Sequence, residues 1–481
     1  MNKLFYGDNL DILQRYIKDE SVDLIYLDPP FNSNATYNVL FGSKDGSDAA
    51  AQIQAFDDTW HWDTVAAESF RSVVEQGGDA SRAMQAFRLL LNDSDMLAYL
   101  SMMAPRLVEM HRALKPTGSI YLHCDPTASH YLKILMDAVF GADNFQNEIV
   151  WHYRRWTGTA KRFLRMHDTI FFYSKSDNYK FNPLFTEYTE KSLKRKQHYH
   201  TRIKGDDVYV TSVDKRGVKE NDVWIISVIN SQAKERLGYP TQKPEELLER
   251  IIQASSNEGD LVLDPFCGCG TTVAVAQRLN RQWIGIDITH LAINLMKHRL
   301  QDAFGEDLKY DVIGEPVSLS GAEKLAKEDP YQFQWWALGL VGARPADEKK
   351  GADAGIDGRI YFHDNVTGET KQVIISVKAG KPHLSHLRDL RGVVDRENAE
   401  IGVLITMYEP TQPMRAEAAS GGFYKSQGWG KNYPRLQILT IEELLDGKGI
   451  DMPPIRQVNQ TYRRAPRRKG EEGRQLGLLE E

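Results

Sequence analysis

The stretch DLVLDPFCGCGTT, residues 260–272, decides the fold of the chain. Its apolar run LVL has the composition of a buried strand, and Gly268 and Gly270 permit a tight turn directly after it. A helix is expected to begin at Thr271. A strand, a glycine loop and a helix N-terminus in this order form the ligand-binding turn of nucleotide-type sites in α/β sheets.

Two carboxylates indicate which class of ligand this turn could bind. Asp264 ends the first strand, and Asp287 ends the next one, RQWIGID (281–287). Asp287 is placed to accept hydrogen bonds from both hydroxyls of a ribose. Asp264 would repel a pyrophosphate and attract an ammonium or sulfonium group. The loop therefore suits a nucleoside that carries positive charge better than it suits NAD.

A second acidic strand end lies in VDLIYLDPPF, residues 22–31. Asp28 follows an apolar run, and Pro29 and Pro30 stop the strand and remove two backbone donors. The result is a cluster of acceptors, the carboxylate and a bare carbonyl or two, beside the ring of Phe31. Such a site suits a planar ligand with an amino group. The alternative interpretation is a strand end followed by a rigid turn.

Strands and helices alternate around both motifs. Strands are expected in KLFYGD (3–8), SIYLHCD (119–125) and NEIVWHY (147–153), and helices in NLDILQRYI (9–17), MLAYLSMMAPRLVEMHRAL (96–114) and LAINLMKHRLQ (291–301). This alternation predicts an α/β fold with a doubly wound, mostly parallel sheet. We assign 1–151 and 236–310 to the two halves of that domain.

Residues 152–235 depart from the alternating pattern. RRWTGTAKR and KSLKRKQHYHTRIK concentrate positive charge and aromatic rings there, which favours a local nucleic-acid surface. The alternative is a solvated loop region. A smaller α/β domain is expected over 311–455, and the charged, apolar-poor segment 456–481 is expected to be disordered.

Composition limits the class of protein. The chain has 481 residues, an ordinary 41% of hydrophobic residues and a net charge of −6, so any nucleic-acid surface must be a local patch. Its three cysteines lack a paired metal spacing and fit a reducing compartment. The absence of a signal peptide, and of an apolar run of about 18 residues, predicts a cytoplasmic protein with no membrane partner.

The two acidic motifs, DPPF at 28–31 and DPFCGCG at 264–270, together resemble the amino-methylating DNA methyltransferases that use S-adenosylmethionine. The catalytic motif precedes the cofactor motif, as in the circularly permuted β-class of adenine-N6 and cytosine-N4 enzymes. YPTQKP (239–244) resembles the cofactor-side motif that precedes the glycine loop in that class. The resemblance covers roughly residues 1–305.

Further segments refine the resemblance. Trp60, Trp62 and NEIVWHYRR (147–155) resemble the subgroup that contains the Mod subunits of type III systems. Residues 152–235 then take the place of the target-recognition region, where Arg and aromatic side chains would read base edges of double-stranded DNA. A homodimer and a restriction subunit are further candidate partners of such a prokaryotic or phage-type protein.

The resemblance also implies the cofactor contacts. Asp287 would hold the ribose, and Asp8 in YGDNL matches an early GD motif, although a helix N-cap is an equally good interpretation of it. The other implied cofactor-binding residues are Thr241, Lys243 and Pro244 at the methionine end, and Asp264, Phe266, Gly268, Gly270 and Thr271 around the glycine loop.

The catalytic residues implied by the resemblance are Asp28, Pro29, Pro30 and Phe31. An exocyclic amino group is a poor nucleophile because its lone pair is delocalised into the ring. The Asp28 carboxylate and the Pro29 carbonyl can accept its two N–H groups, so that the lone pair points at the methyl group and transfer is a direct displacement. The base must be flipped out of the duplex, and stacking on Phe31 would offset part of the unstacking energy.

Three alternatives to an adenine-N6 DNA methyltransferase remain open. Cytosine-N4 enzymes of this motif order more often carry Ser in place of Asp28, so adenine is favoured. Methylation of protein glutamine or RNA is disfavoured, because those relatives usually carry Asn there and lack a large recognition insert. A DNA-binding module without turnover is disfavoured by the intact set of motifs.

In the C-terminal part, GIDG with Asp357 and SVK with Lys378 resemble the PD-(D/E)xK nuclease fold of Mrr-like restriction proteins. Asp357 could ligate Mg²⁺, and Lys378 could steady a hydroxide or a phosphate. Ser376 stands where that pattern usually has Glu or Gln, and serine is a weaker ligand. The alternatives are a single-chain restriction–modification enzyme with Mg²⁺-dependent DNA cleavage, and an inactive domain that binds DNA or a partner.

Overall fold

The computed structural model describes residues 2–30, 61–154, 161, 163–188, 216–230, 232–346, 355–364, 370–454, 461–462 and 465–466, and the backbone alone of 35–42, 48–58, 202–204 and 207–209. Phe31 and Trp60, both named above as candidates, lie outside the described residues. Among the helices that are described, none is both long and apolar enough to cross a membrane.

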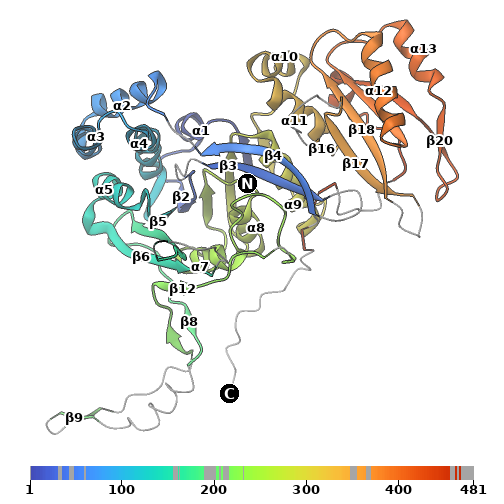
Figure 1. The fold of residues 1–481 in the computed structure, drawn as a ribbon. Helices are drawn as coiled ribbons and strands as arrows, with labels where there is room; N and C mark the ends of the chain where they lie inside the picture. The colour runs from blue at the N-terminus through green and yellow to red at the C-terminus, as the bar shows by residue number, and fades with distance from the viewer. Residues whose placement is uncertain are drawn as a thin grey trace.

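A nine-stranded sheet forms the centre of the N-terminal domain within the described residues (Figure 1). Its strand order is β12-β6-β7-β5-β2-β13-β14-β1-β15. The strands are β1 (Lys3–Tyr6), β2 (Val22–Leu27), β5 (Leu114–Cys124), β6 (Phe145–His152), β7 (His167–Ser174), β12 (Val223–Ile225), β13 (Leu261–Asp264), β14 (Gln282–Asp287) and β15 (Asp311–Ile313).

Neighbouring strands from β5 to β15 run parallel, whereas β7 runs antiparallel to both β5 and β6. Helices cover both faces of the sheet, so the predicted doubly wound, mostly parallel α/β fold is confirmed. One face carries α1 (Asn9–Tyr16), α4 (Asp95–Ala113) and α5 (Ser129–Phe140), with α2 (Thr64–Gln76) and α3 (Gly78–Leu91) packed outside them; the other carries α7 (Glu245–Ser255), α8 (Thr271–Arg278) and α9 (His290–Phe304).

Each face of the sheet has its own apolar core. Leu107 and Leu135 are fully buried on the first face, and Ile251, Val275 and Met296 are fully buried on the second. Burial of one such side chain contributes roughly 1.5–3 kcal/mol relative to exposure. The parallel strands are apolar on both sides for this reason, as the run VDLIYL of β2 shows.

The C-terminal domain has a five-stranded sheet among its described residues, in the order β16-β17-β18-β19-β22. The strands are β16 (Arg344–Pro345), β17 (Gly358–His363), β18 (Thr370–Lys378), β19 (Ile401–Thr406) and β22 (Leu436–Thr440). Helices α10 (Leu319–Glu328), α11 (Pro330–Leu340) and α14 (Ile441–Leu445) pack on one face, and α12 (Leu384–Arg396) and α13 (Gln412–Ser420) pack on the other. This is the smaller α/β domain expected from the sequence.

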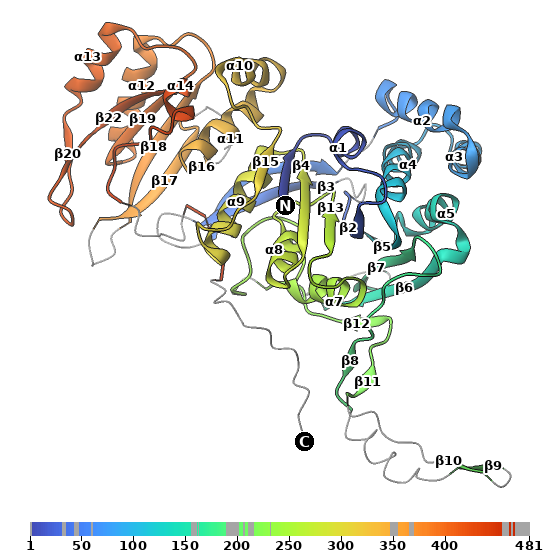
Figure 2. The ribbon, with the colours of Figure 1, turned by 180° about the vertical axis from the view of Figure 1, so that it is seen from behind.

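Short two-stranded ribbons extend from these domains. β8 (Phe185–Thr186) pairs with β11 (Val218–Lys219), and this ribbon projects beyond the β12 edge of the central sheet (Figure 2). The other ribbons pair β3 (Ala35–Gly42) with β4 (Asp48–Asp58), β9 (Arg202–Lys204) with β10 (Asp207–Tyr209), and β20 (Phe423–Lys425) with β21 (Asn432–Pro434).

Two predicted domain boundaries need correction. β15 pairs with β1, so the central sheet continues to Ile313, past the predicted end of the domain at 310. β7 lies inside the range 152–235 yet forms the sheet interior between β5 and β6. Its segment HDTIFFYS is buried from its second residue onward, and the basic sequence on either side of it concealed this strand.

The two domains join through α9 and α11. The Asn294 side chain donates a hydrogen bond to the carbonyl of Trp335 (2.9 Å), and the His290 backbone N–H donates one to the side chain of Gln332 (2.8 Å). A side chain on Gly339 of α11 would collide with Asn294, which lies 2.3–2.5 Å from the position of a Cβ. The helices therefore approach closely enough to require glycine at this contact.

Part of the segment predicted to be disordered reinforces this junction. Tyr462 is 8% exposed, stacks on His298 of α9 with ring centroids 4.1 Å apart, and donates a hydrogen bond from its hydroxyl to the Ala343 carbonyl (2.8 Å). Ala465 is also buried, and its N–H donates to Asp302 (3.3 Å). The prediction of disorder is wrong at these residues, because a tyrosine within a charged segment provides enough apolar surface to dock.

We expect Tyr462→Ala to destabilise the protein by about 2–4 kcal/mol, because it leaves a cavity between α9 and the C-terminal domain. Tyr462→Phe keeps the packing and loses only the hydrogen bond, so it should cost about 1 kcal/mol. Thermal unfolding followed by calorimetry measures both changes. Tyr331→Ala, at a side chain that is 60% exposed, is the control, and an equal loss in all three variants would contradict the docked position of Tyr462.

Candidate active site

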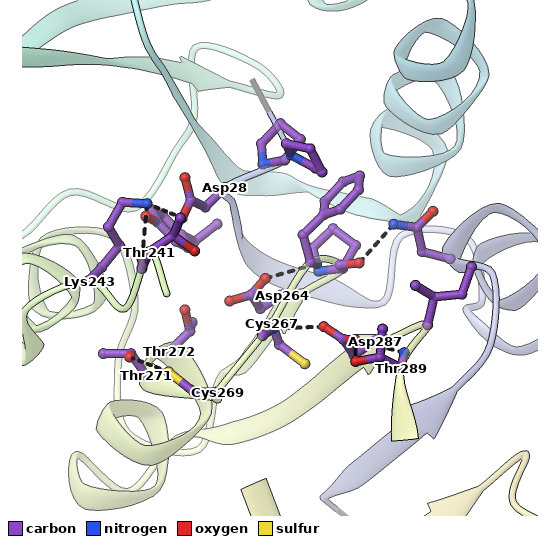
Figure 3. Close-up of a pocket in the computed structure, with 18 of the residues that line it drawn as sticks. Asp28, Thr241, Lys243, Asp264, Cys267, Cys269, Thr271, Thr272, Asp287 and Thr289 are labelled. Carbon is purple, nitrogen blue, oxygen red and sulfur yellow. Dashed lines mark hydrogen bonds and ion pairs between the residues drawn. The ribbon is translucent and has the colours of Figure 1, made fainter. Parts of the chain in front are cut away.

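Three carboxylates stand at one edge of the central sheet. β13 pairs with β2 and with β14, and all three strands run parallel, so their C-terminal ends meet. Asp28, Asp264 and Asp287 therefore line one cavity of about 290 Å³, although they are far apart in the sequence (Figure 3). Ligands of doubly wound sheets bind at this edge, where the strand order reverses.

The glycine loop brings its backbone close to this cavity. Gly268 and Gly270 adopt positive φ angles of 49° and 72°, which other residues rarely adopt. A Cβ on Gly270 would lie 2.7 Å from the side chain of Met296, so a larger residue would not fit. The Gly268 N–H donates to the Asp287 carboxylate (2.9 Å), and α8 begins at Thr271 directly after the loop.

Burial perturbs two of the carboxylates. Burial, together with the negative charges of Asp28 and Asp287, raises the pKa of Asp264 to about 7, although hydrogen bonds from Thr272 and the Phe266 N–H oppose the shift. Burial likewise raises the pKa of Asp287 to about 6, against hydrogen bonds from Thr289 and Gly268. Such a cavity favours a ligand with positive charge, which would compensate the buried carboxylates.

The two oxygens of Asp28 have different surroundings. Oδ2 forms an ion pair with the Lys243 ammonium, whereas Oδ1 is buried and has no hydrogen-bond partner among the described residues. Lys243 also donates to the Thr241 carbonyl (3.4 Å), so the turn at 239–244 reaches Asp28 itself (Figure 3). Lys243, expected at the methionine end of the cofactor, has its charge against the candidate catalytic acid in the structure.

Asp8 serves as a helix cap and as part of the cavity wall. Its Oδ1 accepts a hydrogen bond from the Leu10 N–H (2.7 Å) at the start of α1, and its Oδ2 accepts one from Arg106 (2.7 Å). Arg106 is 9% exposed and also contacts Asn9. Arg106 was not predicted, although a lone arginine within the apolar run 97–108 is a signal for a buried partner.

The structure brings most of the candidate residues together. The cavity is lined by Asp8, Asp28, Pro29, Pro30, Thr241, Lys243, Asp264, Phe266, Gly268, Thr271 and Asp287. Pro244 and Gly270 stand instead at the N-caps of α7 and α8 and do not line it. Tyr26, Tyr239 and Thr289 also line it and were not predicted.

The candidate nuclease residues also come together, in a different arrangement from the expected one. Asp357 Oδ2 accepts hydrogen bonds from the Val377 N–H (2.6 Å) and the Ser376 hydroxyl (3.0 Å), and it lies 3.7 Å from the Lys378 ammonium. Across the described part of the chain, no group of three or more His, Cys, Asp or Glu side chains could hold a metal ion. The Mg²⁺ expected at Asp357 is therefore not supported.

The doubly wound sheet and the acidic glycine-loop cavity define an α/β protein whose cavity lies where such folds carry nucleotide-type ligands. Residues 22–298 match the family of N6 and N4 methyltransferases, described as DNA methylase. The chain belongs to this family, since the match covers more than half of its length. Residues 331–446 match a second family, described as NACHT-associated inactive restriction endonuclease 1.

Individual relatives agree with the family. The chain is 36% identical to the type II methyltransferase M.HpaI of Haemophilus parainfluenzae, over 43% of this chain and 60% of that one. It is 28% identical to M.BglII of Bacillus subtilis, over 60% and 66% of the two chains. It thus spans about two thirds of these relatives or less. Among solved structures it is similar to the cytosine-N4-specific PvuII DNA methyltransferase, with 16% identity and a TM-score of 0.36 over 62% and 86% of the chains.

The raised pKa of Asp264 makes stability depend on pH. Below about pH 3 this carboxyl is protonated in both the folded and the unfolded chain, and as the pH rises toward 7 the unfolded chain gains most by ionising it. Wild-type stability therefore falls over this range, and Asp264→Asn should avoid a loss on the order of 2–4 kcal/mol. Urea unfolding at about pH 4.5 and about pH 8 measures this loss of stability.

The exposed Asp11, whose carboxylate pairs with Arg15 on the surface of α1, provides the matched control for this experiment. Asp11→Asn should leave the pH dependence unchanged. If Asp264→Asn also kept the wild-type dependence on pH, the carboxyl would not be destabilised in the folded protein.

Proposed function

We propose that this protein transfers a methyl group from S-adenosylmethionine to the exocyclic N6 of a flipped adenine in double-stranded DNA, at a specific sequence. The observation that carries the proposal is the position of Asp28 and Pro29 on the same cavity as Asp264, the glycine loop and Asp287. A site for an amino group and a site for a cationic nucleoside thus share one edge of the sheet.

The residues of the cavity fit this cofactor. Asp287 is placed to hold ribose hydroxyls, and the backbone at Gly268 allows a close approach of the ligand. The buried carboxylates of Asp264 and Asp28 complement a positive charge. When bound, S-adenosylmethionine supplies an electrophilic methyl group on a sulfonium sulfur, which takes the bonding electron pair when the methyl group leaves.

The residues of the Asp28 motif orient the nucleophile. One N–H of the target amino group is donated to the Asp28 carboxylate and the other to the Pro29 carbonyl, which directs the nitrogen lone pair toward the cavity. Lys243 holds Asp28 Oδ2 in the structure, so the amino group competes with this ammonium. After the N–C bond forms, the nitrogen carries a positive charge and one N–H proton passes to Asp28 or to water.

We propose that the segment between β7 and β12 recognises the DNA. Its β8–β11 ribbon projects from the sheet (Figure 2). In this ribbon the Arg216 guanidinium lies 4.3 Å from the ring centroid of Phe185. A cation stacked on an aromatic ring suits contacts with phosphates and bases. Base flipping is part of the proposal, because the exocyclic amino group cannot reach a buried cavity from within the duplex.

The finer assignments rest on the motifs. Asp rather than Ser at residue 28 supports adenine-N6 over the alternative, cytosine-N4. The catalytic motif precedes the cofactor motif, which supports the circularly permuted β-class. The likeness to type III Mod subunits stays a prediction from Trp62 and residues 147–155. An intracellular location in a prokaryote or a phage-infected cell, a homodimer and a restriction subunit as partner are likewise proposals that follow from this class.

Asp28→Ala should lower methyl transfer by about 10³-fold or more, because the amino group loses an acceptor that orients its lone pair. Unmethylated genomic DNA is incubated with the protein and S-adenosylmethionine without magnesium, digested to nucleosides, and examined by mass spectrometry. Asp11→Ala, on the exposed face of α1, is the control. N4-methylcytosine would overturn the base assignment alone, and no methylated base with the wild-type protein would contradict the proposed function.

Mg²⁺-dependent DNA cleavage by the C-terminal domain is the second candidate, favoured only by the proximity of Asp357 and Lys378. Because two hydrogen bonds already engage Asp357 Oδ2 and Ser376 replaces an acidic ligand, we expect no cleavage of unmethylated DNA with Mg²⁺. Gel analysis of plasmid DNA checks this. Cleavage that requires Mg²⁺ and disappears in Lys378→Ala would instead establish a single-chain restriction–modification enzyme.

A further inference from the structure

A fully buried histidine stands behind the candidate catalytic acid. β2 and β5 pair in parallel with Leu27 beside Leu122, so the next residue of each strand brings Asp28 beside His123. His123 Nδ1 lies 3.7 Å from Asp28 Oδ1, the buried oxygen for which the described part of the chain provides no hydrogen-bond partner. His123 itself is 0% exposed, so its position depends entirely on the surrounding protein.

The other ring nitrogen of His123 meets a second carboxylate. Nε2 lies 3.3 Å from Asp168 Oδ2, and the Tyr153 hydroxyl donates to the other oxygen of Asp168 (2.9 Å). Burial alone would raise the pKa of Asp168, but the hydrogen bond and charge of His123, the charge of Lys243 and the hydrogen bond from Tyr153 lower it. Asp168 is therefore an acceptor, which fixes a proton on His123 Nε2.

The remaining nitrogen, Nδ1, faces the Tyr26 hydroxyl and the Asp28 carboxylate. The Tyr26 hydroxyl lies 2.9 Å from it and can either donate to it or accept from it. Burial raises the pKa of Tyr26, and so do the charges of Asp28, Asp264 and Asp168, so this hydroxyl stays neutral. Nδ1 therefore faces a neutral hydroxyl on one side and the Asp28 carboxylate on the other.

The surroundings isolate this group from water. The edge of the His123 ring meets the Trp151 ring at a centroid distance of 5.5 Å, and Tyr26, Tyr153 and Trp151 are all buried. The titratable and charged groups around His123 are Tyr26 and Asp28 from β2 and its end, Asp168 from β7, Tyr153 after β6, Lys243 across Asp28, and Asp264 beside Tyr26. Electrostatic effects are large in such a dry site.

We propose that His123, held by Asp168, is a positioning residue for methyl transfer that sets the orientation and charge of the Asp28 carboxylate from behind. This inference rests on the proposed function and adds a residue to it. The carboxylate lies between two basic groups, Lys243 on its cavity side and His123 on its buried side. When the target amino group displaces Lys243, His123 remains beside the Asp28 carboxylate. It then maintains the anionic form and the orientation of that carboxylate.

The test compares His123→Asn with a control on the same strand. Tyr121 also lies on β5, is buried on the same face, and its hydroxyl hydrogen-bonds Ser255 (2.7 Å) without a contact to Asp28. Tyr121→Phe therefore removes a buried hydrogen bond and leaves the Asp28 surroundings intact. Asp168→Asn is the second catalytic-site variant, because it frees His123 Nε2 and keeps the histidine.

Methyl transfer is measured from acidic to alkaline pH, together with cofactor affinity by calorimetry. We expect kcat of His123→Asn to fall by about 10- to 100-fold, with KM for DNA and the cofactor Kd changed by less than about threefold. The acid limb of the pH profile of kcat should move to higher pH in His123→Asn, because the Asp28 carboxylate loses the neighbour that favours its anionic form. Asp168→Asn should move the limb in the same direction, and Tyr121→Phe should not move it.

An unchanged acid limb in both His123→Asn and Asp168→Asn would overturn the proposal, since a purely structural histidine would lower stability without moving it. A second readout needs no activity. In the protein with ¹⁵N-labelled histidines, the His123 ring signal, identified by its loss in His123→Asn, should change its titration midpoint in Asp28→Asn. If the wild-type protein methylates nothing, the proposed function fails, and this spectrum alone decides whether His123 and Asp28 interact.

Discussion

The pairing of β13 with β2 on one side and β14 on the other is the constraint on which the site depends. It places the ends of three parallel strands, and thus Asp28, Asp264 and Asp287, around one cavity. Burial and mutual repulsion of these acids oppose folding, and donors from the loop at Phe266 and Gly268 offset part of that cost. The same unfavourable charge is what makes the cavity complementary to a cation.

Six strands of the central sheet could be predicted, because buried parallel strands are continuous apolar runs, and several of them end in an aspartate, as LVLD and LIYLD show; β7, β12 and β15 were not predicted. β7 was missed because the basic sequence on either side of it concealed its buried segment, HDTIFFYS. The docking of Tyr462 was missed for a related reason. A single aromatic residue in a charged segment gives no periodic signal, and its burial depends on α9 and on the Ala343 carbonyl.

The residues of the candidate site also fall into those that the sequence could predict and those that it could not. Residues at strand ends and in the glycine loop were predicted because their type and their position both suggest a ligand. Arg106 and His123 were not, since each lies within a regular apolar element and its role depends on a partner in another strand or helix. Lys243 was predicted at the cavity, but only the fold shows that its charge meets Asp28. The local sequence indicates which residues are candidates for a functional site, and the topology of the fold determines which of them lie in contact.

Both ends of the segment between Ser174 and Val223 are fixed to the central sheet, by β7 in its interior and by β12 at its edge. Lengthening the chain between these two fixed ends costs little additional conformational entropy, because the entropic cost of closing a loop grows only with the logarithm of its length. Insertions and exchanges there leave the acidic strand ends in place. The fold thus allows the surface carried by this segment to diverge rapidly among relatives while the chemistry at the other strands is inherited unchanged.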